Sequence, residues 1–257
     1  LPYPRRMPRY PFARRSIALV AAVIAVFAGA CTTSDATTDP TTPSTVTTVP
    51  LAVVPVDYQG FLRQPTACGA EQPDTAVDMK FDAPGDAGVD GPTTVTLSTS
   101  CGPLVIELDP GTAPETVNSF VFLAEQGYFD GTVSHRVIPG FMAQAGGYTP
   151  GLELKEDDAR IPNESGNGMS NVRGTIAMAR TNDPHSANTQ FFINVADNVR
   201  LDPGTNRWGY AVFGYVIEGM EVVDEIVSVR TGPQGKLRSD VPMVPIVIKK
   251  MSRVTYD

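Results

Sequence analysis

Residues 174–194 read GTIAMARTNDPHSANTQFFIN and contain an apolar run at 174–179, a polar loop and the start of a second apolar run, 191–195. Short runs of β-branched and aromatic residues, bounded by Asn, Asp, Ser and Pro, are typical of strands joined by a surface connection. The stretches on either side have the same character: HRVIPGFMAQAGG at 135–147 and GYAVFGYVIEGMEVVD at 209–224. The centre of the chain therefore predicts several short strands separated by turns.

The flanking sequence adds further strands. TTVTLST at 93–99 and LVIEL at 104–108 enclose a Ser-Cys-Gly-Pro turn, which predicts a hairpin. Other short β-like runs cover 133–138, 141–145, 211–216 and 245–249. The chain shows no internal repeat.

Two helices are expected among the strands. Apolar residues at 117, 120, 121 and 124 have the spacing of one helical face, with Thr112 as the expected N-cap, Pro114 in the first turn and Gly127 after the end. A second short helix is expected at 220–227. Many short strands with two helices favour a β-sandwich or a closed barrel whose ends the helices cover.

The three quoted motifs closely resemble motifs of the cyclophilins and follow one another in the same order as in that family. The resemblance runs from about residue 93 to residue 254. It implies a mainly β fold: a closed eight-stranded antiparallel β-barrel capped by two α-helices, with the active site in a groove on its outer surface. It also implies peptidyl-prolyl cis-trans isomerase activity on proline-containing polypeptides, without a cofactor or a metal.

The reaction explains the residue types that the resemblance assigns to the site. Rotation about an X-Pro bond breaks no bond, so a catalyst must hold the peptide and favour the twisted amide over the planar forms. Arg136 matches the family's catalytic arginine, a fixed cation that can donate a hydrogen bond to the proline nitrogen. The positions that match the family's substrate-binding residues are Phe141, Met142, Gln144, Ala179, Arg180, Gln190, Phe192, Leu201 and Tyr210.

Several positions depart from the best-known eukaryotic members. Tyr210 stands where they carry His, and Arg200 falls where they carry the Trp that contacts cyclosporin, which implies only weak cyclosporin binding. Ser134 replaces an aromatic residue and Ala145 replaces a Gly, and some loss of efficiency is the expected consequence. His135 is expected to be a hydrogen-bonded structural residue, because rotation needs no proton transfer to a leaving group.

Composition narrows the partners. The 28 acidic and 20 basic residues give a net charge of −8, which argues against nucleic-acid binding. Three Cys and two His lie far apart, without a Cys-x-x-Cys or His-Glu-x-x-His pattern, so no metal is assigned. We expect a monomer.

The N-terminal part resembles an export signal. A basic start precedes the apolar run 17–30, which ends in Ala-Gly-Ala before Cys31 and resembles a lipobox. Residues 1–30 are therefore expected to be a signal peptide, with a lipid on Cys31 that holds the protein at the outer face of the membrane. Cleavage after Ala30 without acylation, giving a secreted protein, is the alternative.

Three further regions are expected after the signal. Residues 31–56, rich in Thr and Pro, predict a disordered tether, 57–90 an extension that packs on the main domain, and 91–257 the cyclophilin-like domain. Cys68 and Cys101 are the only cysteines of the exported part besides Cys31, so a disulfide between them is expected, with two unpaired thiols as the alternative.

Two other functions stay open at this stage. A cyclophilin-like groove could hold proline-containing segments as a chaperone without turnover, although a pure binder would not need Arg136. A membrane-anchored interaction protein would instead use the Thr/Pro-rich segment and the extension as its working parts.

Overall fold

The computed structural model describes residues 66–69, 78–155 and 157–255. The expected signal peptide with Cys31 and the expected tether lie outside the described residues, as does half of the expected extension. No helix in the described part is long and apolar enough to cross a bilayer.

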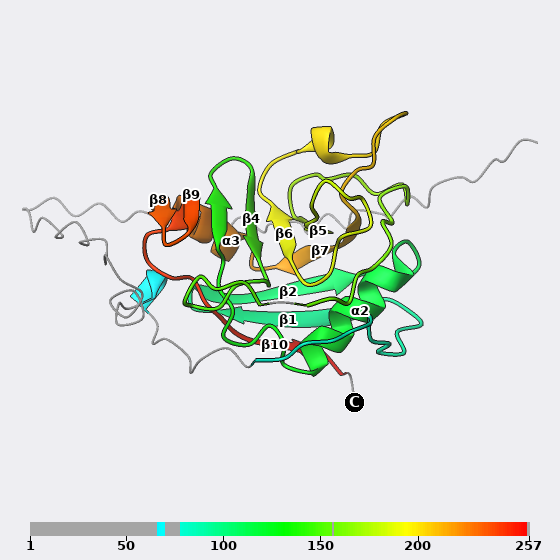
Figure 1. Cartoon of the computed structure of the whole chain (residues 1–257), viewed down its shortest axis with the longest axis horizontal. Helices are drawn as coiled ribbons and strands as arrows, with labels where there is room; N and C mark the ends of the chain where they lie inside the picture. Colours follow the sequence, from blue (N-terminus) through cyan, green and yellow to red (C-terminus); the bar gives the residue numbers. More distant parts are fainter. Residues whose placement is uncertain (1–65, 70–77, 156, 256–257) are drawn as a thin grey trace, which may run out of the picture. The chain divides into compact units, whose positions relative to one another are not determined.

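Eight strands form one antiparallel sheet in the order β10-β1-β2-β7-β5-β6-β4-β3 (Figure 1). In chain order they are β1 (Thr93–Thr99), β2 (Gly102–Leu108), β3 (Arg136–Ile138), β4 (Met142–Ala145), β5 (Thr175–Met178), β6 (Phe191–Asn194), β7 (Val212–Glu218) and β10 (Ile248–Arg253). All eight match runs expected from the sequence, and the largest shift is in β10, expected at 245–249. The residues before β10 are bonded instead to the segment that precedes β3.

This sheet curls but does not close through a continuous ladder. The segment before β3 spans the gap to β10: the Gly131 N–H donates to the Ile248 carbonyl of β10 at 2.8 Å, and Val133 and Val247 form an isolated bridge. The Ser134 N–H also donates to the Ile246 carbonyl at 2.9 Å. The expectation of a closed barrel was therefore an overstatement, and the sheet is a partial barrel. In the described residues β3 pairs with β4 on one side, and its other neighbour is β9 (Leu237–Pro242) of the separate two-stranded sheet.

The two expected helices are α2 (Pro114–Glu125), which contacts β10, and α3 (Met220–Ser228). The apolar face of α2 predicted from the sequence is buried. The expected cap at Thr112 is wrong, because the cap position is Ala113 and makes no side-chain cap bond. Glu164 from a distant loop instead accepts the Thr116 N–H at 2.9 Å, and a carboxylate there complements the helix dipole.

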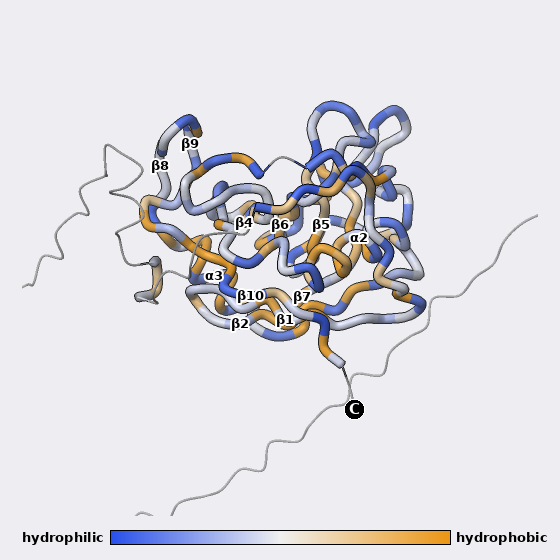
Figure 2. The backbone as a smooth tube through the Cα atoms, turned by 60° about the horizontal axis from the view of Figure 1, so that its bottom comes forward, coloured by the Kyte–Doolittle hydropathy of each residue, from blue (hydrophilic) through white to orange (hydrophobic). Residues whose placement is uncertain are grey.

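An aromatic cluster fills the space between α2 and the sheet. Phe120 of α2 packs on Phe129, Phe191 and Phe213 at centroid distances of 5.1, 5.3 and 5.0 Å. All four side chains are almost fully buried. Figure 2 shows hydrophobic segments concentrated along the strands and hydrophilic ones in the loops. The face of the sheet that carries this cluster is therefore its core side, and the opposite face is the one available for a binding site.

A second, two-stranded sheet was not predicted. β8 (Thr231–Gln234) and β9 pair as a hairpin after α3. Their sequence, TGPQGKLRSDVP at 231–242, contains Gly, Pro and charged residues and therefore reads as a loop.

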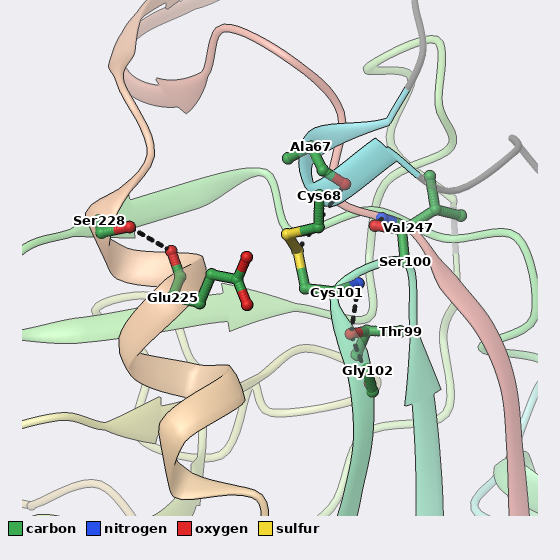
Figure 3. Close-up of a disulfide and its surroundings, with 9 residues drawn as sticks. All are labelled: Ala67, Cys68, Thr99, Ser100, Cys101, Gly102, Glu225, Ser228 and Val247. Atoms are coloured by element: carbon green, nitrogen blue, oxygen red, sulfur yellow. Dashed lines mark hydrogen bonds between the residues drawn. A yellow bond between two sulfur atoms is a disulfide. The ribbon is translucent and has the colours of Figure 1, made fainter.

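The described residues of the N-terminal region contact the domain. Phe81 packs on Phe122 with ring centroids 5.1 Å apart. Its N–H donates to the Asp157 carboxylate at 3.4 Å, and its carbonyl accepts from the Asp158 N–H at 3.3 Å. Cys68, in the short 3-10 helix η1 (Ala67–Gly69), forms a disulfide with Cys101 in the turn between β1 and β2 (Figure 3).

Candidate active site

The central strands carry two separate apolar clusters, because side chains alternate across a sheet. Ala143, Ile176, Ile193 and Phe213 join the main core. Their chain neighbours Met142, Ala177, Phe192 and Val212 form a second buried cluster. The second cluster therefore lies on the opposite face of the sheet from the main core and supplies an apolar floor there.

A pocket of about 120 Å³ opens over this floor. Its lining residues all belong to the set expected from the resemblance: Arg136, Phe141, Met142, Gln144, Ala179, Arg180, Phe192, Leu201 and Tyr210. The expected residue outside this lining is Gln190, whose Oε1 accepts from Gln144 Nε2 at 2.9 Å. The structure thus brings the whole predicted set together from five separate segments of the chain.

Gln190 lines a larger hollow of about 490 Å³. This hollow shares Gln144, Ala179 and Arg180 with the small pocket, so the two form one continuous groove. An extended peptide with one side chain in the small pocket has room to continue into the larger hollow.

Strand register explains why the positively charged Arg136 side chain lies beside the apolar floor. Arg136 pairs with Gln144 across β3 and β4, and Gln144 pairs with Phe192 across β4 and β6. Directly paired residues point to the same face of a sheet, so these side chains form one row. Asp240 of β9 approaches Arg136 Nε to 3.6 Å with its Oδ2. Sequence reasoning missed Asp240, because no local signal links the β8–β9 hairpin to β3.

The wall of the pocket is held by aromatic and backbone contacts. The rings of Phe192 and Tyr210 meet edge to face at 5.7 Å, and the guanidinium of Arg180 stacks 4.6 Å from the Tyr210 ring centroid. Arg180 also donates to the carbonyls of Trp208 at 2.8 Å and Gly209 at 3.1 Å. These contacts fix Tyr210 and Arg180 before any substrate binds.

Two glycines allow the groove to form between the small pocket and the larger hollow. A Cβ on Gly147 would lie 2.4 Å from the Gln190 side chain. Gly146 has φ +90°, and a Cβ there would lie 2.6 Å from the Thr189 carbonyl oxygen. A side chain at either position would displace the 189–190 segment and with it the Gln144–Gln190 bond.

The two departures from the family pattern beside the site strands lie off the pocket. Ala145 belongs to the main core and Ser134 is buried, and neither lines the pocket or the larger hollow. Their side chains do not narrow the groove.

His135 is buried outside both hollows and stacks on Tyr148 at 4.3 Å. Burial lowers its pKa to about 4, the neighbouring Arg136 acts in the same direction, and the Val133 backbone and Gln190 side chain oppose it. His135 is therefore neutral near pH 7. In the described part of the chain, no three His, Cys, Asp or Glu residues gather in a geometry that could hold a metal ion.

The family model described as cyclophilin type peptidyl-prolyl cis-trans isomerase/CLD matches residues 94–253. The chain belongs to the cyclophilin family. It is 51% identical over 160 residues to the peptidyl-prolyl cis-trans isomerase cyp18 of Streptomyces antibioticus, a match that covers 61% of this chain and 96% of that protein. Peptidyl-prolyl cis-trans isomerase B of Escherichia coli (strain K12) is 46% identical over 161 residues, covering 62% and 98%.

Solved structures agree with this assignment. A cyclophilin type peptidyl-prolyl cis-trans isomerase from Cryptosporidium parvum superposes with a TM-score of 0.54 at 25% identity, covering 65% of this chain and 99% of that one. The same protein in the presence of the dipeptide Ala-Pro gives a TM-score of 0.53 at 25% identity, covering 63% and 99%. The protein is thus a cyclophilin-type peptidyl-prolyl cis-trans isomerase.

Proposed function

We propose that this cyclophilin accelerates X-Pro rotation in exported proteins and thereby assists their folding, with Arg136 as its catalytic residue. The main support for these residue roles is the pocket of about 120 Å³, where an apolar floor of Met142 and Phe192 lies beside the Arg136 side chain. A proline ring needs an apolar site, and the twisted amide next to it needs a donor.

The physics of rotation gives Arg136 its role. Amide resonance opposes rotation with a barrier of about 18–20 kcal/mol, and it is lost when the bond twists. The proline nitrogen then becomes pyramidal and regains a lone pair that can accept a hydrogen bond. A fixed guanidinium donates to that nitrogen only in the twisted state, so it lowers the barrier without stabilising either planar isomer.

The remaining groove residues hold the peptide. Gln144 and Gln190 present amide groups beside the pocket, and Ala179 and Arg180 follow the end of β5, where the main chain of an extended peptide can pair with the protein. The presence of Ala-Pro in a related crystal structure supports a proline-containing ligand for this groove.

For location, we propose export followed by acylation of Cys31 at the outer face of the membrane, with residues 31–56 as a tether. The apolar run 17–30, the small residues before Cys31 and the Thr/Pro-rich stretch after it support this. X-Pro isomerisation takes tens to hundreds of seconds, so it limits folding outside the cell as it does inside. Mass spectrometry of membrane-extracted protein tests the location, because an N-terminal diacylglyceryl Cys31 supports it and an unmodified Cys31 in a soluble form contradicts it.

Turnover of a Xaa-Pro peptide by the full chain, beside an Arg136→Ala variant, tests the catalytic role. We expect kcat/KM to fall by about 100-fold or more in the variant while its thermal unfolding is unchanged. Arg253→Ala, at a partly exposed arginine of β10 that pairs with Glu125 and lines neither hollow, is the matched control and should retain activity within about threefold. A folded wild-type protein that binds proline peptides without accelerating their isomerisation would identify a chaperone-like module instead.

A further inference from the structure

A third hollow, of about 360 Å³, adjoins the proline pocket and shares Arg180, Leu201 and Tyr210 with it. Arg200 and Arg207 complete its basic lining, and neither Asp nor Glu is among the residues that line it in the described part of the chain. The whole chain has a net charge of −8, so three arginines around one hollow form a local positive site on an acidic protein.

Arg200 and Arg207 retain most of their hydrogen-bonding capacity, whereas each guanidinium nitrogen of Arg180 already donates to a backbone carbonyl. Arg207 uses one terminal nitrogen to donate to the Asp202 backbone carbonyl at 2.7 Å. The Asp202 carboxylate itself accepts from Ser170 Oγ at 2.5 Å and from the Asn171 N–H at 2.7 Å. Within the described residues Arg200 has neither a hydrogen bond nor an ion pair, and its guanidinium lies 4.8 Å from the Phe141 ring centroid.

The position of Arg200 connects this hollow to the reaction. Phe141 lines the proline pocket, so a guanidinium over its ring holds positive charge at the pocket rim. The stacking also limits the freedom of the Arg200 side chain, which reduces the entropy lost when it binds an anion. A planar guanidinium can accept a carboxylate in a two-pronged arrangement.

We propose that this arginine hollow, formed by Arg180, Arg200 and Arg207, binds the carboxylate of an Asp or Glu that adjoins the substrate proline. The inference rests on the proposed function of the groove. A proline bound in the pocket would place the neighbouring residue of the peptide beside the adjoining hollow. Substrates with an acidic residue beside proline are then preferred over neutral ones, and basic residues at the same place are disfavoured. Selection against Lys follows from the same field that attracts Glu.

Two peptide series test the proposal, with Glu, Gln or Lys placed either directly before or directly after the proline. Both kcat/KM and the Kd from fluorescence anisotropy are measured, with the wild type, Arg200→Gln, Arg207→Gln and the double variant. At one of the two positions we expect the wild type to prefer Glu over Gln by about fivefold and the double variant to show no preference. Arg253→Gln, which removes a partly exposed charge outside all three hollows, should keep the preference.

Salt provides a second readout, because contacts of exposed charges weaken as ionic strength rises. The Glu preference should shrink strongly at about 1 M NaCl, where the screening length is about 3 Å. Guanidinium groups bind phosphate as well as carboxylate, so millimolar inorganic phosphate at constant ionic strength should reduce the Glu preference of the wild type. A Glu preference that phosphate leaves unchanged would overturn the proposal.

The binding assay separates this inference from the proposed function. Peptides that bind with a Glu preference but are not isomerised would refute catalysis and support the arginine hollow. Isomerisation without any Glu preference at either position, or a preference that survives in the double variant, would overturn the arginine hollow and leave the proposed function standing.

Discussion

The carboxylate of Asp240 lies 3.6 Å from Nε of Arg136, although the two residues are far apart in the sequence. Asp240 belongs to the β8–β9 hairpin, and Arg136 begins β3 at the edge of the main sheet. The pair is partly exposed, so its energy is small, but it bears on the residue proposed to act in catalysis.

Removal of the Asp240 charge should weaken the positioning of Arg136. Asp240 has φ +63°, which Asn also tolerates, so Asp240→Asn should fold normally. We expect kcat/KM to fall about two- to fivefold at low salt, with wild type and variant converging at about 1 M NaCl. Asp224→Asn, which breaks the surface pair with Arg173, is the matched control and should leave kcat/KM unchanged. Equal activities at low salt would remove Asp240 from any role at the site.

Adjacent phenylalanines in β6 should separate activity from stability. Phe191 points into the aromatic core, whereas Phe192 forms the pocket floor. Phe191→Ala should lower the free energy of unfolding by about 3–5 kcal/mol. Phe192→Leu should keep most of the stability and lower kcat/KM about tenfold, mainly through KM, because the proline ring loses its flat contact surface. Urea unfolding and peptide kinetics measure the two effects, and the reverse pattern would refute the assignment of the two faces.

The low pKa of the buried His135 predicts that the protein loses stability in mild acid. Its pKa is about 4 in the folded protein and about 6.5 when unfolded, so between these values the unfolded state binds more protons. Stability is therefore unaffected by His135 above about pH 6.5, and falls as the pH drops from about 6.5 to about 4. The total loss is on the order of 3 kcal/mol. Chemical unfolding of wild type and His135→Gln across this range measures it, and parallel pH profiles would contradict the prediction.

The disulfide should stabilise the domain without contributing to catalysis. Cys68 and Cys101 are 33 residues apart in the sequence, and such a loop closure is worth about 3–4 kcal/mol in the chain-entropy model. Reduction should lower the Tm of the wild type and leave that of a Cys68→Ser/Cys101→Ser variant unchanged. Peptide turnover below the transition should be the same in both, because neither Cys lines the proline pocket. A drop in turnover on reduction alone would show that the bridge affects the groove.

Local periodicity was sufficient for the eight strands of the main sheet, and the resemblance to the family's motifs for the set of pocket residues. Period-2 apolar runs place side chains on two faces wherever they occur, and the family motifs assigned Arg136, Phe141, Met142 and Phe192 to one site before any contact was known. The three motifs remain close to the pocket because β3, β4, β5, β6 and β7 are neighbours in one sheet.

Other features depend on contacts between distant segments, and nothing in the sequence of either segment predicts the contact. Glu164 caps α2 in place of Thr112, since a cap needs only an acceptor in the right place and not a neighbour in sequence. The β8–β9 hairpin is too polar and too rich in Gly and Pro to predict as strands, yet it carries Asp240 to Arg136.

The sequence by itself determined the family, the order of the strands along the chain, the apolar faces and the residue types of the groove, because each depends on local periodicity or on a continuous motif. Only the tertiary structure decided the incomplete closure of the barrel, the pairing of Arg136 with Asp240 and the convergence of Arg180, Arg200 and Arg207 around one hollow. These depend on distances between separate segments, which the curvature of the sheet and the packing of its core establish.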